Sequence, residues 1–240
     1  MERLGEAFDV QPFTKGLRDG VAIGLGYLSV SFSFGINAAQ GGLTILQTAL
    51  ISMTNLTSAG QLAGLNLMIA LAPLAELFLV QLTINIRYAL MSMSLTQKLD
   101  NSMTFAHRLG AAFFITDEVF AVASSQSGLI GRSYLYGLAT MPYMGWALGT
   151  LLGAAAGSLL PASVTTALGI AIYGMFIAII VPPMKKLKAV RLVVLVALGL
   201  NLALKYIPLF DFISDGVAIV LCSVVAAGVG AYCHPAEEGA

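Results

Sequence analysis

Long apolar runs fill most of the chain, and glycine, proline, asparagine or charged residues interrupt them. Eight runs are long enough to be membrane-spanning segments, at residues 20–39, 44–63, 66–90, 109–126, 134–157, 163–182, 190–208 and 213–232. The strict alternation of apolar and polar residues that a barrel strand needs does not occur. The pattern predicts an all-α integral membrane protein, a polytopic bundle of about eight transmembrane helices with room for broken or re-entrant ones.

Two pairs of segments, the second with the third and the last with its predecessor, are nearly continuous, which indicates tight helical hairpins. The segment 109–126 departs from the pattern, because it holds Asp117 and Glu118 at its middle. We expect a single transmembrane domain over residues 1–240, with residues 1–19 as a cytoplasmic N-terminal segment.

The composition excludes several classes of protein. Hydrophobic residues make up 58% of the chain and charged residues 10%, with a mean hydropathy of +0.88, whereas a soluble domain carries about 25% charged residues. This excludes a soluble enzyme, a disordered chain and a collagen-like fibre. A net charge of zero gives no electrostatic footprint for nucleic acid. Two cysteines and two histidines far apart predict no metal site, and we expect no cofactor.

Lysine and arginine residues predict the orientation, because they accumulate in cytoplasmic loops. With eight spans and both termini inside, Lys98 and Arg108 fall outside. The cytoplasmic side then collects Arg3, Lys15, Arg18, Arg132, Lys185, Lys186, Lys188 and Arg191. We therefore expect a multi-pass protein of the bacterial cytoplasmic (inner) membrane with both termini in the cytoplasm. A re-entrant segment would change this parity.

Small residues in two segments indicate how helices pack. Gly149, Gly153 and Gly157 lie four apart on one face of the fifth segment, and Gly20 and Gly24 repeat the spacing on the first. This spacing favours close helix packing in lipid.

The first segment also carries serines at positions 29, 31 and 33, which cannot share one helical face. Either the helix unwinds there and lines a cavity, or each hydroxyl bonds back to its own helix.

Polar groups interrupt the second and third segments. The stretch 54–61 contains Asn55 and Gln61 beside a glycine that permits a break, and 81–88 contains Asn85 and Arg87. Glu76 lies earlier in the third segment. These groups either hydrogen-bond between helices or face water or a ligand. Arg87 can also snorkel from the end of its helix.

Two adjacent carboxylates, Asp117 and Glu118, stand in the fourth segment. Ionisable groups inside a membrane segment are expensive and mark functional sites. Neighbouring side chains on a helix point about 100° apart, so the two carboxylates need different partners. An ion pair with Arg87 or Arg108 is compatible with a further role in carrying a proton.

Several motifs, in their order along the chain, resemble the AzlC family of branched-chain amino acid exporters and permeases. They are Gly16-Leu17-Arg18-Asp19-Gly20, Gly35, Ser58-Ala59-Gly60-Gln61, Asn85-Ile86-Arg87-Tyr88-Ala89-Leu90-Met91, Ser94-Leu95, and Phe114-Ile115-Thr116-Asp117-Glu118 with Ala121. The resemblance implies export of branched-chain amino acids together with a small membrane subunit of the AzlD type.

We therefore predict a secondary transporter that exports branched-chain or similar apolar amino acids, with proton coupling and no enzymatic activity. The substrate-binding candidates are Ser31, Asn55, Gln61, Asn85 and Arg87, and the ion-coupling candidates are Glu76, Asp117 and Glu118. Phe32, Phe34 and Phe114 are candidates for an apolar pocket. A passive channel for a small polar solute is the alternative, and it would use the same polar groups as a pore lining.

Overall fold

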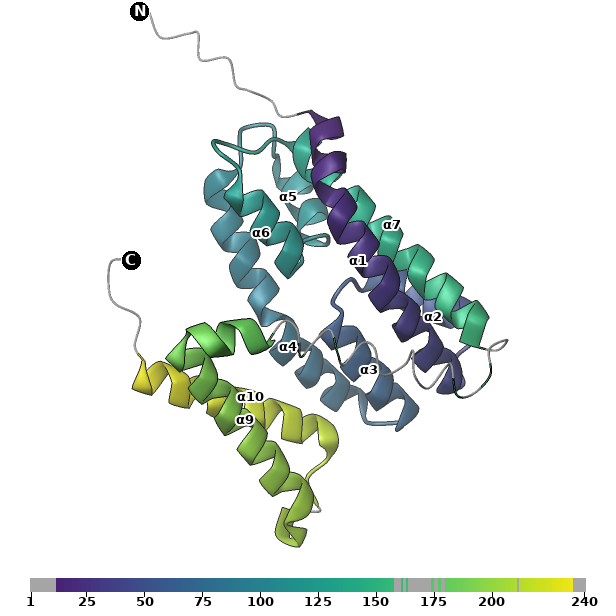
Figure 1. Ribbon diagram of the computed structural model, residues 1–240, viewed down its shortest axis with the longest axis vertical. Helices are drawn as coiled ribbons and strands as arrows, with labels where there is room; N and C mark the ends of the chain where they lie inside the picture. Colours follow the sequence, from purple (N-terminus) through teal and green to yellow (C-terminus); the bar gives the residue numbers. More distant parts are fainter. Residues whose placement is uncertain are drawn as a thin grey trace, which may run out of the picture. The chain divides into compact units, whose positions relative to one another are not determined.

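The computed structural model describes residues 12–157, 161, 163, 174, 177, 180–210 and 212–234. Within these residues every regular element is a helix, which confirms the all-α architecture (Figure 1). The α-helices are α1 (Phe13–Gln40), α2 (Ile45–Thr54), α3 (Ala59–Ile69), α4 (Leu74–Leu95), α5 (Phe105–Ala112), α6 (Asp117–Ser125), α7 (Arg132–Gly157), α9 (Lys188–Tyr206) and α10 (Asp215–Cys233). Two short 3₁₀ helices, Thr96–Lys98 and Pro208–Phe210, follow α4 and α9. The predicted segment 163–182 falls largely outside the described residues.

Four helices of the described chain, α1, α4 with its 3₁₀ extension, α9 and α10, are long and apolar enough to cross a membrane. The chain divides into two compact units. Unit 1 takes its described residues from Met1–Gln61 and Ile86–Gly169, and unit 2 from Leu62–Asn85 and Ile170–Ala240. The expectation of a single domain stays a prediction.

Helices α1 and α7 lie side by side and run parallel in unit 1 (Figure 1). Gly16 packs on the backbone of Tyr134 and Leu138 near the start of both helices, and Gly35 packs on that of Thr150 near their ends. Between these points a side chain at Gly145 would collide with the backbone of α1 at Gly24. The glycine spacing in the sequence therefore reflects close helix packing, as predicted.

The serines of α1 do not unwind it, because the helix is continuous from Phe13 to Gln40. The Ser29 hydroxyl donates to the carbonyl of Gly26 at 2.8 Å, and Ser31 reaches the carbonyls of Leu28 and Gly145 at 3.4 Å. The interpretation of this stretch as an unwound cavity lining was wrong. The hydroxyls instead satisfy carbonyls of their own helix and of α7.

Helices α5 and α6 form a hairpin whose two ends meet. The backbone N–H of Ile130 donates to the carbonyl of Lys98 at 2.7 Å, and that of Asp100 donates to Ile130 at 3.0 Å. The ammonium group of Lys98 also binds the carbonyl of Gln126, at 2.7 Å. With eight and nine residues, each helix is about 12–14 Å long, roughly half the hydrocarbon thickness. The prediction of one helix at 109–126 was wrong, because the chain breaks at residues 113–116, between α5 and α6.

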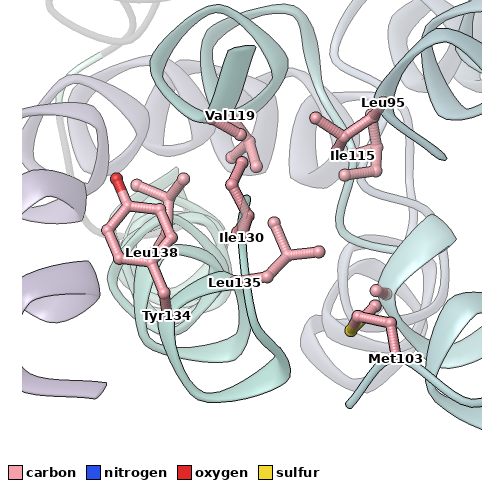
Figure 2. Close-up of a cluster of buried hydrophobic side chains, with 10 residues drawn as sticks. Leu95, Met103, Ile115, Val119, Ile130, Tyr134, Leu135 and Leu138 are labelled. Atoms are coloured by element: carbon pink, nitrogen blue, oxygen red, sulfur yellow. The ribbon is translucent and has the colours of Figure 1, made fainter. Parts of the chain in front are cut away.

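A buried apolar cluster holds the α5–α6 hairpin against α7 and the end of α4 (Figure 2). Ile130 lies among side chains from all of these elements. The buried members labelled in the figure are Leu95, Met103, Ile115, Val119, Ile130, Tyr134, Leu135 and Leu138. The hairpin is thus fixed at its open end by backbone hydrogen bonds and along its length by apolar packing.

A break at residues 55–58 separates α2 from α3. Thr44 caps α2 through a capping box with Gln47. Across the break, the Gln61 side chain in the first turn of α3 donates to the Ser52 hydroxyl near the end of α2, at 2.5 Å. The predicted boundary at 63–66 was wrong, because α3 is continuous from Ala59 to Ile69 and the turn to α4 follows it.

Unit 2 contains two pairs of adjacent helical segments. The α3 residue Gly64 lies against the Gln81 side chain of α4, and residues 70–73 connect the two helices. Helices α9 and α10 pack together with the 3₁₀ turn Pro208–Phe210 between them. The predicted hairpin of the last two segments is confirmed.

Replacing Gly145 by alanine should destabilise unit 1, because the added Cβ would collide with the backbone of Gly24. We expect a loss of about 1–3 kcal/mol, seen as a lower melting temperature of the detergent-solubilised protein. Gly26→Ala is the matched control, since no heavy atom lies within 4 Å of a Cβ built at Gly26 of α1. Equal melting temperatures for the two variants would contradict the glycine packing.

Candidate functional site

The two helix breaks, at residues 55–58 and 113–116, lie beside the middle of long helices in unit 1. Tyr27, near the midpoint of α1, packs with Leu56 from the α2–α3 break and donates a hydrogen bond to Glu118 from the start of α6. Tyr143, near the midpoint of α7, contacts both breaks as well. Its hydroxyl donates to the carbonyl of Met53 at 3.1 Å, and its ring lies edge-on to Phe114. We refer to residues 55–58 and 113–116 as the two tips.

The adjacent carboxylates have different partners, as their helical positions required. Asp117 forms an ion pair with Arg87 of α4 at 2.9 Å, and each side chain is 45% exposed. Glu118 accepts a hydrogen bond from Tyr27 of α1. The α5–α6 tip is therefore attached to α1 and α4 through charged groups. The predicted ion pair between a carboxylate of this segment and Arg87 is confirmed.

Helix α4 links the two tips through its consecutive residues Arg87 and Tyr88. The guanidinium group of Arg87 donates to the Tyr88 hydroxyl at 3.1 Å, and this hydroxyl reaches the carbonyl of Thr57 at 3.5 Å. The Thr57 hydroxyl in turn donates to the Asn55 side-chain oxygen at 2.7 Å. A chain of polar contacts thus runs from Asp117 to the predicted substrate-binding residue Asn55.

The ends of two half-length helices converge at the tips. Thr116 caps α6 by accepting from the backbone N–H of Val119 at 3.3 Å, so Asp117 and Glu118 occupy the first turn. The partial positive charge of a helix N-terminus stabilises such carboxylates. Helix α3 likewise begins directly after the tip at 55–58. A small charged solute would meet helix ends, a guanidinium group and two carboxylates here.

Gln61 and Ser31 use their hydrogen bonds inside the protein. Gln61 is 1% exposed; it accepts from the Trp146 indole N–H at 2.9 Å and donates to Ser52. Ser52 in turn shares a hydrogen bond with Thr150 at 2.7 Å. Ser31 is fully buried between α1 and α7. These two predicted substrate-binding residues connect α1, α2, α3 and α7, and their direct contact with substrate stays a prediction.

Two other predicted site residues, Glu76 and Asn85, belong to unit 2. Glu76 accepts from the backbone N–H of Gly216 at the start of α10, at 2.8 Å, and lines a cavity of about 730 Å³ within this unit. Asn85 donates to the Gln81 side chain at 2.9 Å, while its buried side-chain oxygen has no hydrogen-bond partner in the described part of the chain. Their predicted roles stay predictions.

The apolar candidates lie in different surroundings. Phe34 is completely buried in α1. Phe114 stands at the α5–α6 tip, with its ring centroid 5.0 Å from that of Phe113 and 5.4 Å from that of Tyr143. These three rings give the site an apolar surface beside its charged groups.

Three residues at the site were not among the predicted site residues: Tyr27, Tyr88 and Ser58. Tyrosine is an ordinary residue in an apolar segment, so only its position near a span's midpoint could have marked Tyr27. Ser58 has a φ of +48°, which a serine rarely adopts, and its buried hydroxyl has no hydrogen-bond partner among the described residues. No group of three histidine, cysteine, aspartate or glutamate side chains in the described ranges could hold a metal ion.

Comparison with known proteins assigns the chain to a family. Residues 22–160 match the family described as AzlC protein. An uncharacterized membrane protein of Archaeoglobus fulgidus is 33% identical over 72% of this chain and 76% of its own. The inner membrane protein YgaZ of Escherichia coli is 26% identical over 94% of each chain. No solved structure matches the chain.

Replacing Gln61 by alanine should destabilise the protein, because the buried indole N–H of Trp146 and the hydroxyl of Ser52 both lose a partner. An unsatisfied buried group costs about 1–3 kcal/mol, which a thermal unfolding experiment in detergent resolves. Gln97→Ala, at an exposed position of the 3₁₀ turn after α4, is the control. Unchanged unfolding of Gln61→Ala would show that these hydrogen bonds contribute nothing to stability.

Proposed function

Because the chain belongs to the AzlC family, a family of membrane proteins with a role in transport, we propose that it exports branched-chain or similar apolar amino acids across the bacterial cytoplasmic membrane. The observation that carries this proposal is the half-exposed ion pair of Arg87 and Asp117 at the meeting point of the two tips. Secondary transporters bind their substrates near the membrane midplane, at the ends of broken helices.

The ion pair suits a zwitterionic substrate. Arg87 is permanently charged and can hold a carboxylate in a fork of two hydrogen bonds. Asp117 supplies the negative charge that an ammonium group needs, and the carbonyl of Thr57 lies along the same chain of contacts. In the proposed complex the substrate's two charged ends replace the direct contact between Arg87 and Asp117. Asn85 remains a candidate for supporting the carboxylate.

The apolar part of the substrate finds aromatic side chains beside the charges. Phe113, Phe114 and Tyr143 form edge-to-face contacts with one another. An isoleucine, leucine or valine side chain gains free energy by leaving water for such a surface, roughly 1.5–3 kcal/mol when fully buried. An apolar amino acid therefore matches both halves of the site.

The transport is coupled to protons in this proposal, with Glu118 as the carrier. Its carboxylate is held by a neutral hydroxyl, that of Tyr27, and not by a cation. A group in this setting can change its protonation state without breaking an ion pair. The family resemblance also brings a small AzlD-type membrane subunit into the proposal, and co-purification with the product of a neighbouring reading frame tests that partner.

We infer the orientation from the α5–α6 hairpin, which is re-entrant in this proposal. Because the ends of α5–α6 meet, Lys98 and Arg108 share one end of unit 1 with the first turns of α1 and with Arg132 at the start of α7. Lys15 bonds Gln126 at this end, at 2.8 Å. Positive residues accumulate on the cytoplasmic side, so this end and the N-terminus face the cytoplasm. The two cations assigned to the outside by an eight-span count then move inside.

Export of labelled isoleucine from loaded cells tests the function. The double variant Asp117→Asn, Glu118→Gln should lose at least about tenfold in export rate, since charge-assisted contacts contribute about 1.5–3 kcal/mol each. Asp19→Asn is the control, because Asp19 bonds Tyr134 away from the tips. An uncoupler should abolish export against a gradient. Undiminished export by the double variant would contradict the site, and insensitivity to the uncoupler would favour a passive facilitator.

Cysteine labelling tests the orientation in a chain whose Cys222 and Cys233 have been replaced by serine. In intact spheroplasts an impermeant maleimide should label Gln40→Cys, at the far end of α1, and should label Gln97→Cys only after permeabilisation. In the proposed orientation these residues lie on opposite faces of the membrane, which is supported by the parallel course of α1 and α7 and by the closed ends of α5–α6. Equal labelling of both in intact spheroplasts would mean that α5–α6 crosses the membrane.

A further inference from the structure

We propose that Tyr27 is a positioning residue that ties the protonation of Glu118 to the contact between the two tips, while Asp117 serves the substrate. This inference rests on the proposed function and gives the two carboxylates separate roles. It concerns a residue that has no cation, metal or motif of its own. The geometry around its ring and hydroxyl carries the argument.

Tyr27 contacts both tips through different parts of its side chain. Its hydroxyl donates to Glu118 in the first turn of α6, directly after one tip. Its ring packs with Leu56, which belongs to the other tip, and lies edge-on to Trp146 of α7 with the centroids 5.2 Å apart. Only 9% of the residue is exposed. The ring is therefore fixed by α7 and one tip, and its hydroxyl holds the other.

The two carboxylates differ in what holds them. Asp117 faces the guanidinium group of Arg87, and this pair is 45% exposed on each side chain, so a solute can reach it. Glu118 faces a tyrosine hydroxyl in a part-buried contact. The charged or titratable groups around Glu118 are Asp117 on its own helix, Tyr27 on α1, and Arg87 and Tyr88 on α4. Glu118 thus lies one residue away from the charge pair and outside it.

Protonation of Glu118 changes the bond to Tyr27. The ionised carboxylate accepts the tyrosine O–H in a charge-assisted hydrogen bond, which is about twice as strong as a neutral one. When a proton binds to Glu118, the acceptor becomes neutral and the bond weakens, with no other covalent change. The α5–α6 tip is then held less firmly to α1 and to the Leu56 tip. Proton binding to Glu118 therefore loosens the contact between the two tips.

The test measures isoleucine transport in inside-out membrane vesicles over a series of pH values on the cytoplasmic side. Tyr27→Phe keeps the ring on Leu56 and Trp146 but removes the O–H. The removed O–H bonds the Glu118 carboxylate directly, so we expect the pH of half-maximal transport to differ from that of the wild type. Tyr134→Phe is the control, since it removes a tyrosine–carboxylate bond, to Asp19, at the cytoplasmic ends of α1 and α7.

A second measurement covers the case in which the transport rate of Tyr27→Phe falls because the variant is unstable. In a Glu118→Gln background the Tyr27→Phe change should shift the pH profile no further, because the titrating group is already gone. Equal profiles for wild type and Tyr27→Phe, or a shift that persists without Glu118, would overturn the role of Tyr27 and leave the proposed function standing. Absence of isoleucine transport by the wild type would instead overturn the proposed function.

Discussion

A polar group at half-depth in a bilayer needs a partner within the protein, since lipid supplies none. Unit 1 contains two helix breaks, at residues 55–58 and 113–116, and the polar contacts of the site gather around them. The carbonyl of Met53 receives the Tyr143 hydroxyl, and that of Thr57 receives Tyr88. The carboxylates that begin α6 receive Arg87 and Tyr27. The long helices α1, α4 and α7 thus serve as the partners of the broken ones.

Patterns within single segments of the sequence predicted the features that depend on the geometry of single helices. Apolar runs gave the positions of α1, α7, α9 and α10, because each of these helices must cover its own backbone with apolar side chains. Glycines four residues apart predicted the close packing of α1 and α7, because that spacing places them on one helical face. The need for separate partners for Asp117 and Glu118 followed from their angular separation alone.

Long-range contacts decided the features that the sequence could not predict. An apolar run of 18 residues has the same composition whether it crosses the membrane or returns, and the bond between Lys98 and Ile130 is what shows that α5–α6 returns. Gln61 and Ser31 looked like exposed binding groups, but their partners lie on α7, more than 80 positions further along the chain. Tyr27 carries no sequence signal, since its importance arises from what surrounds it.

The two charges of the site sum to zero, and this limits which solutes can bind there. Arg87 and Asp117 neutralise each other across 2.9 Å. A solute that carries only a carboxylate would bind Arg87 and leave Asp117 without a partner. An amine would bind Asp117 and leave Arg87 without one. Either solute would leave an uncompensated charge in a membrane segment, which is costly. A zwitterion replaces one ion pair by two and leaves no charge without a partner. The proposed selectivity for an amino acid over either of its ionic fragments rests on this electrostatic constraint.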